Sequence, residues 1–159
     1  MASTGKTYVG MGPWPSTYAH LSPLPEKSAQ SHPAGAILQT SSGSLISASS
    51  NACVTSMWGI AVAAGDDSAT NGAVNAQCFR FEQGKEYIGV FAGVLGTANV
   101  GGSAATAAIS VYSNGYPTLT TGTGVSNSSL VRVQRPVPGW AVGDTNPLVI
   151  FIPLDAALQ

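Results

Sequence analysis

The chain begins MASTGKT, and the triplet Gly5-Lys6-Thr7 matches the last three positions of a phosphate-binding loop. That motif is G-x-x-x-x-G-K-[ST], and it joins an apolar strand to a helix. No apolar strand pattern precedes Gly5, and no helical pattern follows Thr7. We therefore expect a polar N-terminus here and no nucleotide site.

The other side chains that could act as acids or bases are few and scattered. His20 and His32 lie in a proline-rich segment, which is a poor place for a base whose geometry must be held, and we expect both to be solvated. Asp66-Asp67 and Asp144 lie in predicted turns, where Asp commonly bonds to nearby backbone. We predict no catalytic residue, cofactor or metal ligand, so the protein is not expected to be an enzyme.

Two glutamates flank the turn Gln83-Gly84-Lys85. Glu82 and Glu86 lie beside Arg80 and Lys85, an arrangement typical of opposite charges paired across a hairpin on a solvated face. We therefore interpret these carboxylates as surface groups and not as the acid and base of a glycosidase.

Cys53 and Cys78 are the only cysteines. They show no Cys-x-x-Cys spacing, so a zinc site is not indicated. Reduced cysteine behaves as a small apolar side chain, and we expect two buried thiols. A disulfide between them is the alternative.

Charge is the unusual feature of the composition. Only 8% of the 159 residues are charged, against about 25% in typical globular domains. No Lys, Arg, Asp or Glu occurs between Lys27 and Asp66 or between Glu86 and Arg132. A soluble monomer normally keeps a charged surface, so an uncharged one indicates a protein covered by partners in an assembly. The formal net charge of −1 gives no reason to expect nucleic acid or a membrane as partner.

Residues 1–33 are expected to form an extended arm. Proline removes a backbone donor and favours extended conformations, which excludes a helix or a central strand. The arm either lies on a neighbouring molecule or folds back on its own domain, and the sequence leaves both open. Its prolines are Pro13, Pro15, Pro23, Pro25 and Pro33, and the apolar side chains expected to contact a partner are Tyr8, Trp14, Tyr18, Leu21 and Leu24.

Residues 34–159 are expected to form one all-β domain, a small antiparallel β-barrel or a jelly-roll-like sandwich. Short apolar or alternating segments separated by turn residues are typical of such folds, and we find no amphipathic helix. Trp140, in Pro-Gly-Trp, is expected at a loop tip and is a further candidate partner-binding residue. The expected strands are 35–40, 44–49, 57–64, 76–82, 86–94, 106–113, 130–136 and 147–153, and the expected core includes Phe79, Phe81, Val131, Val133, Ile150 and Ile152.

Three segments together resemble the decoration, or cement, proteins of tailed-bacteriophage heads. They are HPAGAILQTSSGSLISASS, the apolar MWGIAVAAG and the closing VGDTNPLVIFIPLDAAL, and the resemblance spans about residues 33 to 159. It implies a small β-barrel or jelly roll that trimerises on the outer capsid surface and bridges subunits of the major capsid protein. This chain is longer than the smallest, lambda-like members.

Two alternatives follow for function. The first is a structural cement protein of a virion, made in the host cytoplasm, since no secretory signal is found in the first thirty residues. The second is a carbohydrate- or receptor-binding β-module of a virion or cell surface, supported by the tryptophans and tyrosines.

Overall fold

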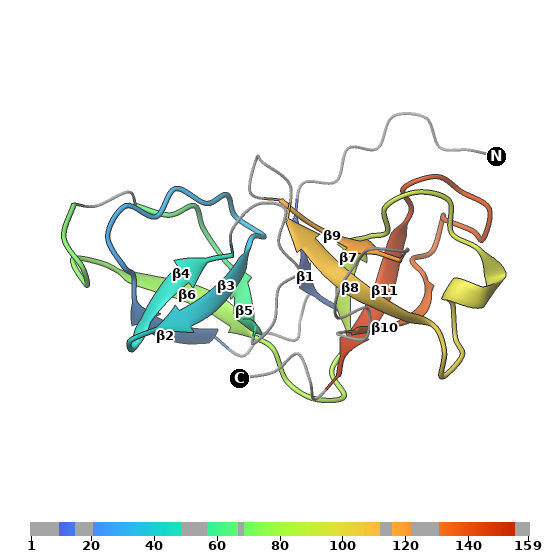
Figure 1. The fold of residues 1–159 in the computed structure, drawn as a ribbon, viewed down its shortest axis with the longest axis horizontal. Helices are drawn as coiled ribbons and strands as arrows, with labels where there is room; N and C mark the ends of the chain where they lie inside the picture. Colours follow the sequence, from blue (N-terminus) through green and yellow to red (C-terminus); the bar gives the residue numbers. More distant parts are fainter. Residues whose placement is uncertain are drawn as a thin grey trace.

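The computed structural model describes residues 10–14, 21–48, 57–66, 69–111, 116–121 and 131–154, without the side chains of residues 21–23 and 111. These residues form two antiparallel sheets and one short 3₁₀ turn, η1, at Thr97–Asn99. The two sheets lie side by side along the long axis of the molecule (Figure 1). The all-β prediction is therefore confirmed, and the arrangement of the sheets is sandwich-like.

Sheet A has six strands in the order β1-β7-β11-β10-β8-β9. They are Gly12–Pro13 (β1), Tyr87–Val90 (β7), Leu148–Pro153 (β11), Val131–Pro136 (β10), Thr106–Val111 (β8) and Pro117–Thr120 (β9). Sheet B has five strands in the order β2-β6-β5-β3-β4. They are Leu21–Pro25 (β2), Asn75–Arg80 (β6), Met57–Ala61 (β5), Ile37–Ser41 (β3) and Ser44–Ser47 (β4).

Each sheet curls back on itself. In sheet A, Phe91, directly after β7, forms a single parallel bridge with Leu119 of β9. In sheet B, Glu26, directly after β2, forms the same kind of bridge with Leu45 of β4. One bridge does not make a ladder, so over the described residues neither sheet closes into a barrel, and the sandwich is the architecture observed.

The two faces of β5 explain how the sheets pack. Met57 and Ile60 point into a core that also contains side chains of sheet A. Trp58 and Ala61 point the other way, into a smaller core inside the curl of sheet B. The β3–β5 register shifts at Trp58, and this bulge interrupts the alternation of faces, so that Met57 and Ile60 share one face although they are three residues apart. Both faces of β5 are thus covered, as its apolar sequence requires. The large core shared by the sheets includes Met11, Ile37, Phe81, Tyr87, Phe91, Leu95, Ile109, Leu119, Val131, Val133, Val149 and Phe151.

Most of the predicted core is observed. Phe81, Val131, Val133 and Ile150 are buried, whereas Phe79 and Ile152 are half-buried. Phe79 nevertheless packs against the shared core. The two strands expected at 35–40 and 44–49 are present as β3 and β4, and they form an antiparallel hairpin. Its two-residue turn, Ser42-Gly43, has positive φ angles of 52° and 80°, as a type I′ turn requires.

The hairpin predicted around Gln83-Gly84-Lys85 is wrong. The strand before the turn, β6, belongs to sheet B, and the strand after it, β7, belongs to sheet A. The turn therefore carries the chain from one sheet to the other. Consequently Glu86 does not pair across a hairpin but forms two hydrogen bonds with Arg135 of β10, at 2.7 and 3.0 Å.

The described part of the predicted arm lies on the chain's own sheets. β1 pairs with β7 at the edge of sheet A, and β2 pairs with β6 at the edge of sheet B. Proline cannot donate to a strand ladder and is found mainly on edge strands, which explains why Pro13, Pro23 and Pro25 occupy these positions.

Candidate functional site

Of the six residues predicted to bind a partner, Trp14, Leu24 and Trp140 have described side chains, and Leu24 lies on a different sheet from the two tryptophans. Tyr8 and Tyr18 lie outside the described residues, and Leu21 is described only by its backbone in β2. Leu24 packs against the small core of sheet B. The two tryptophans, Trp14 and Trp140, are both half-buried.

Trp14 and Trp140 are positioned by sheet A. The backbone N–H of Trp14 donates to the carbonyl of Glu86 at 2.9 Å, which extends the pairing of β1. Trp140 closes a turn in which its N–H donates to the carbonyl of Val137, also at 2.9 Å. Trp140 was expected at a loop tip and lies at the end of this turn, half-buried, which gives it the clearest loop setting among the predicted contact residues.

A defined surface begins at Trp140 and is made of two loops that hydrogen-bond to each other. We call residues 93–99 and 140–146 the uncharged loop surface. Asn146 and Gly93 exchange two hydrogen bonds, through the Asn146 side chain and backbone, each at 2.8 Å. Leu95 bonds to the carbonyl of Asp144 and accepts from Gly143. These bonds fix both loops against each other, and η1 lies at the end of the molecule farthest from sheet B (Figure 1).

The side chains of this surface are uncharged except for one. Val94 is 61% exposed and Val142 is 43% exposed, although large aliphatic side chains usually avoid water. Its single charged residue is Asp144, whose carboxylate accepts a hydrogen bond from the Ala141 N–H at 2.9 Å. Asp144 is thus a turn residue, as predicted, and the surface offers a partner almost no charge.

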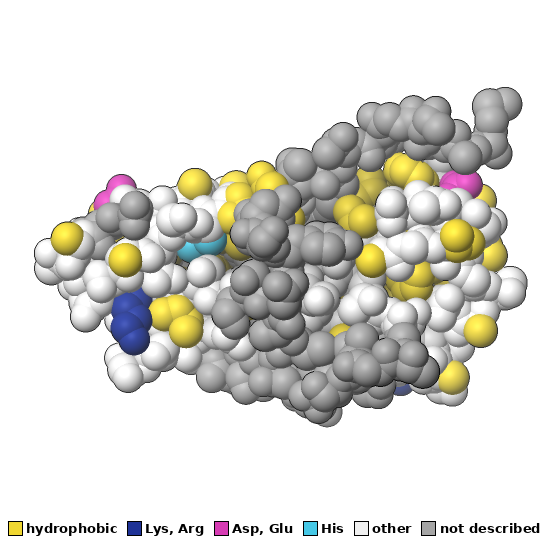
Figure 2. Space-filling view, turned by 45° about the horizontal axis from the view of Figure 1, so that its top comes forward, with side chains coloured by type: hydrophobic (Ala, Val, Ile, Leu, Met, Phe, Trp, Pro, Cys, Tyr) yellow, Lys and Arg dark blue, Asp and Glu magenta, His cyan; other side chains and the backbone are white. Residues whose placement is uncertain are grey.

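The low charge of the chain is visible on the molecule. Figure 2 shows one face, on which the coloured Lys, Arg, Asp and Glu side chains are few and well separated. Most of the described surface there is neither acidic nor basic. The face seen in Figure 2 is thus mainly uncharged, as the low charge content of the sequence predicts.

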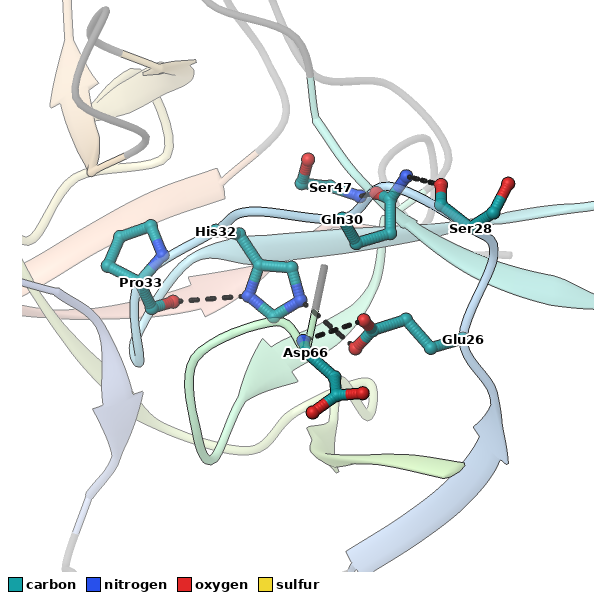
Figure 3. A network of polar contacts seen from close by, with 7 residues as sticks. All are labelled: Glu26, Ser28, Gln30, His32, Pro33, Ser47 and Asp66. Atoms are coloured by element: carbon teal, nitrogen blue, oxygen red, sulfur yellow. Dashed lines mark hydrogen bonds and ion pairs between the residues drawn. The ribbon is translucent and has the colours of Figure 1, made fainter. Parts of the chain in front are cut away.

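The second candidate site is a buried polar network on sheet B. His32 was expected to be solvated, and this is wrong: its side chain is only 3% exposed and faces the Glu26 carboxylate at 3.6 Å, with Glu26 4% exposed (Figure 3). The reason is the curl of sheet B, which brings the segment after β2 under the loop that follows β5. The Asp66 N–H donates to Glu26 Oε1 at 2.9 Å, so this residue of the predicted Asp66-Asp67 turn is tied to a distant segment.

A hollow of about 270 Å³ lies beside this network. Glu26 and Asp66 line it with charged side chains, and the rest of its wall is uncharged. The other lining residues are Val62, Ala63, Ala64, Val74, Asn75, Ala76 and Gln77. Among the described residues, no three His, Cys, Asp or Glu side chains gather closely enough to hold a metal ion.

Cys78 is a reduced, buried thiol in the small core of sheet B. Burial raises its pKa from the ordinary 9.0 to about 11, while the nearby Arg80 guanidinium and Trp58 indole act in the opposite direction. The Arg80 guanidinium lies 3.4 Å from the centre of the Trp58 ring. A thiol with a raised pKa is a poor nucleophile. Cys53 lies outside the described residues.

Comparison with known proteins gives no family assignment, because no protein family, curated protein or solved structure matches the chain. In the part of the chain that the structure describes, no helix has the length and apolar character needed to cross a membrane.

Proposed function

We propose that this protein is a structural, non-enzymatic decoration protein that binds the outer surface of a phage head as a homotrimer. In this role it bridges neighbouring subunits of the major capsid protein and stabilises the shell. The observation that carries the proposal is the uncharged loop surface, with Val94 and Val142 exposed on loops held by mutual hydrogen bonds.

The physical argument concerns desolvation. Binding removes water from both partners, and any charge left unpaired in the interface opposes association. A surface of small and apolar side chains avoids that penalty and gains from burial of apolar area. Loops already held in place also lose little conformational entropy on docking, which favours affinity.

Charge insertion on the uncharged loop surface tests this proposal. The double substitution Val94→Lys and Val142→Lys should weaken binding to heads that lack the protein by at least about tenfold, because unpaired buried charges strongly oppose association. Both positions are exposed, so the fold should be unaffected. Binding is measured by co-sedimentation with purified heads.

Val62→Lys is the matched control. Val62 is also exposed, at 37%, but lies in the loop directly after β5, where it lines the hollow. The Val62→Lys variant should bind heads as tightly as the wild-type protein does. Equal binding by the double variant and the wild type would exclude the loop surface as the contact.

The oligomeric state is measured separately by native mass spectrometry of the purified protein. A stable trimer supports the cement role. A monomer whose mass shifts on glycan addition would instead favour a carbohydrate-binding module.

A further inference from the structure

The dipeptide Asn71-Gly72 carries a chemistry that the proposed function does not use. Asparagine is a chemically labile residue, because the backbone nitrogen of the following residue can attack its side-chain amide. Glycine in the following position gives this attack the least steric hindrance, since it has no Cβ. Asn-Gly occurs twice in the chain, and the second occurrence, Asn114-Gly115, lies outside the described residues.

The reaction replaces the side-chain amide nitrogen of Asn71 in two steps. The Gly72 nitrogen loses its proton to water and bonds to Cγ of Asn71. The Cγ–Nδ2 bond breaks, and the amide group leaves as ammonia after taking a proton back from water. Water then opens the cyclic imide, either at Cγ, which gives aspartate, or at the Asn71 backbone carbonyl, which gives isoaspartate. One water is consumed and one ammonia is released, so no oxidant or reductant is needed.

Asn71 and Gly72 are the central residues of a tight turn that precedes β6. Gly72 has a φ of 71°, and the Ala73 N–H donates to the Thr70 carbonyl at 3.3 Å. A positive φ at the third residue is what a type II turn requires. Both central residues are exposed, so water reaches them and does not limit the reaction.

The segment directly after β2 holds both reacting groups. The Gly72 N–H donates to the Glu26 carbonyl at 2.8 Å. The Ser28 N–H donates to Oδ1 of Asn71, also at 2.8 Å. The first bond keeps the proton on the attacking nitrogen, and the second fixes the orientation of the side chain that would be attacked. The reaction therefore requires local separation of residues 26–28 from the turn 70–73, an opening of the kind by which folded proteins expose single segments.

We propose that Asn71 is a site of spontaneous deamidation, which the native fold keeps closed until residues 26–28 separate from the turn 70–73. Aspartate or isoaspartate at this position adds a negative charge to a chain that has few charges. Isoaspartate also lengthens the main chain before Gly72 by one carbon atom, which alters the geometry of both hydrogen bonds. The inference is independent of the proposed function, because it involves no residue of the uncharged loop surface.

The wild-type protein tests the proposal without any substitution. The full chain is incubated in one mildly alkaline buffer with and without urea, and peptide mapping by mass spectrometry follows the replacement of the amide by a carboxyl group. One hydrogen bond changes an equilibrium constant by about two- to tenfold, so two should slow deamidation of Asn71 in the native protein at least about fivefold relative to the unfolded chain. Equal rates with and without urea would overturn the proposal.

Asn114 is the internal standard for the unfolded chain, because it also precedes a glycine. In urea, Asn71 and Asn114 should both be converted. If Asn71 stayed intact in urea while Asn114 reacted, Asn71 would not be a modification site.

Ser28→Pro tests the role of the segment, because it removes the N–H that holds Asn71. Ser28 and Ala29 are the central residues of a turn in which Ala29 has a φ of 58°, and a type II turn favours proline before such a residue. The Ser28 carbonyl, which accepts from the Gln30 side chain at 3.1 Å (Figure 3), is kept. In the native state this variant should deamidate at Asn71 about two- to tenfold faster than the wild type.

Ser28→Ala is the matched control, since it retains the backbone N–H and removes only the hydroxyl. It should deamidate at the wild-type rate. Equal rates in the proline and alanine variants, with circular dichroism like that of the wild type in both, would exclude the segment as what protects Asn71. The comparison with and without urea decides the proposal on wild-type protein alone should the proline variant not fold.

Discussion

The hydroxyl of Tyr87 offers a sharp test of how the two sheets are joined. Tyr87 is fully buried at the start of β7, directly after the turn that carries the chain from sheet B to sheet A. Its hydroxyl donates to the carbonyl of Arg80 at 2.8 Å and accepts from the N–H of Glu82 at 2.9 Å. The side chain thus holds both ends of the connection through two hydrogen bonds.

The substitution Tyr87→Phe removes one oxygen atom and keeps the ring. The ring contacts with Phe81, at 4.7 Å between centroids, and Phe151, at 6.0 Å, should therefore persist. A typical hydrogen bond contributes about 0.5–1.5 kcal/mol, so losing two should lower the free energy of unfolding by about 1–3 kcal/mol. For a chain of this length, about 2 kcal/mol corresponds to a fall in Tm of about 4–8 °C.

Urea unfolding followed by tryptophan fluorescence measures this effect. Tyr87→Leu, which also removes the ring contacts, should be clearly more destabilising than Tyr87→Phe, because it leaves space in the shared core. If Tyr87→Phe changed the unfolding free energy by less than about 0.5 kcal/mol, the hydroxyl would not be what holds the connection.

Two further predictions concern the thiol and the N-terminal segment. Burial raises the pKa of Cys78 from 9.0 to about 11. The protonated Cys78 thiol therefore contributes fully to the free energy of unfolding below pH 9, and this contribution is lost as the pH rises toward 11. The loss amounts to about 2–3 kcal/mol, and Cys78→Ala should flatten this part of the stability profile in urea unfolding at pH 8–11. Deleting residues 2–30 removes β1, β2 and Glu26, so the truncated chain should melt well below the full chain in circular dichroism. An unchanged Tm would show that these strands contribute nothing to the domain.

Local patterns in the sequence were sufficient to predict several strands. In β10, Val131 and Val133 are buried while Arg132 and Gln134 are half-buried, because strict alternation places every second residue on one face. The turn at Ser42-Gly43 was also predictable, since it requires positive φ angles and contains a glycine.

Long-range pairing could not be predicted from the same patterns. The residues on both sides of Gln83-Gly84-Lys85 have strand character, and nothing local shows that they join different sheets. His32 was misjudged for a similar reason, because its burial depends on Glu26 and on the loop after β5.

The candidate surface was only partly predictable. Trp140 follows Pro-Gly and was placed in a turn from sequence. Val94 was instead expected as the last residue of the strand 86–94, and its 61% exposure depends on how its loop pairs with residues 140–146. Exposure of an aliphatic side chain is set by tertiary packing and leaves no local signal.

The order of strands along the chain has a consequence for synthesis. β1 belongs to sheet A, but its partner β7 follows all of sheet B in the sequence. On the ribosome, where the N-terminal part emerges first, sheet B has all its strands before β7 appears. The segment around β1 therefore has no strand partner until β7 has been synthesised. Pro13 is favourable during this time because proline lowers the capacity of an open strand edge to pair with a wrong strand. Sheet B is in this sense an insertion between the first strand of sheet A and the rest. The pairing of Gly12 with Ile88 is a late event that joins the beginning of the chain to a sheet completed by its end.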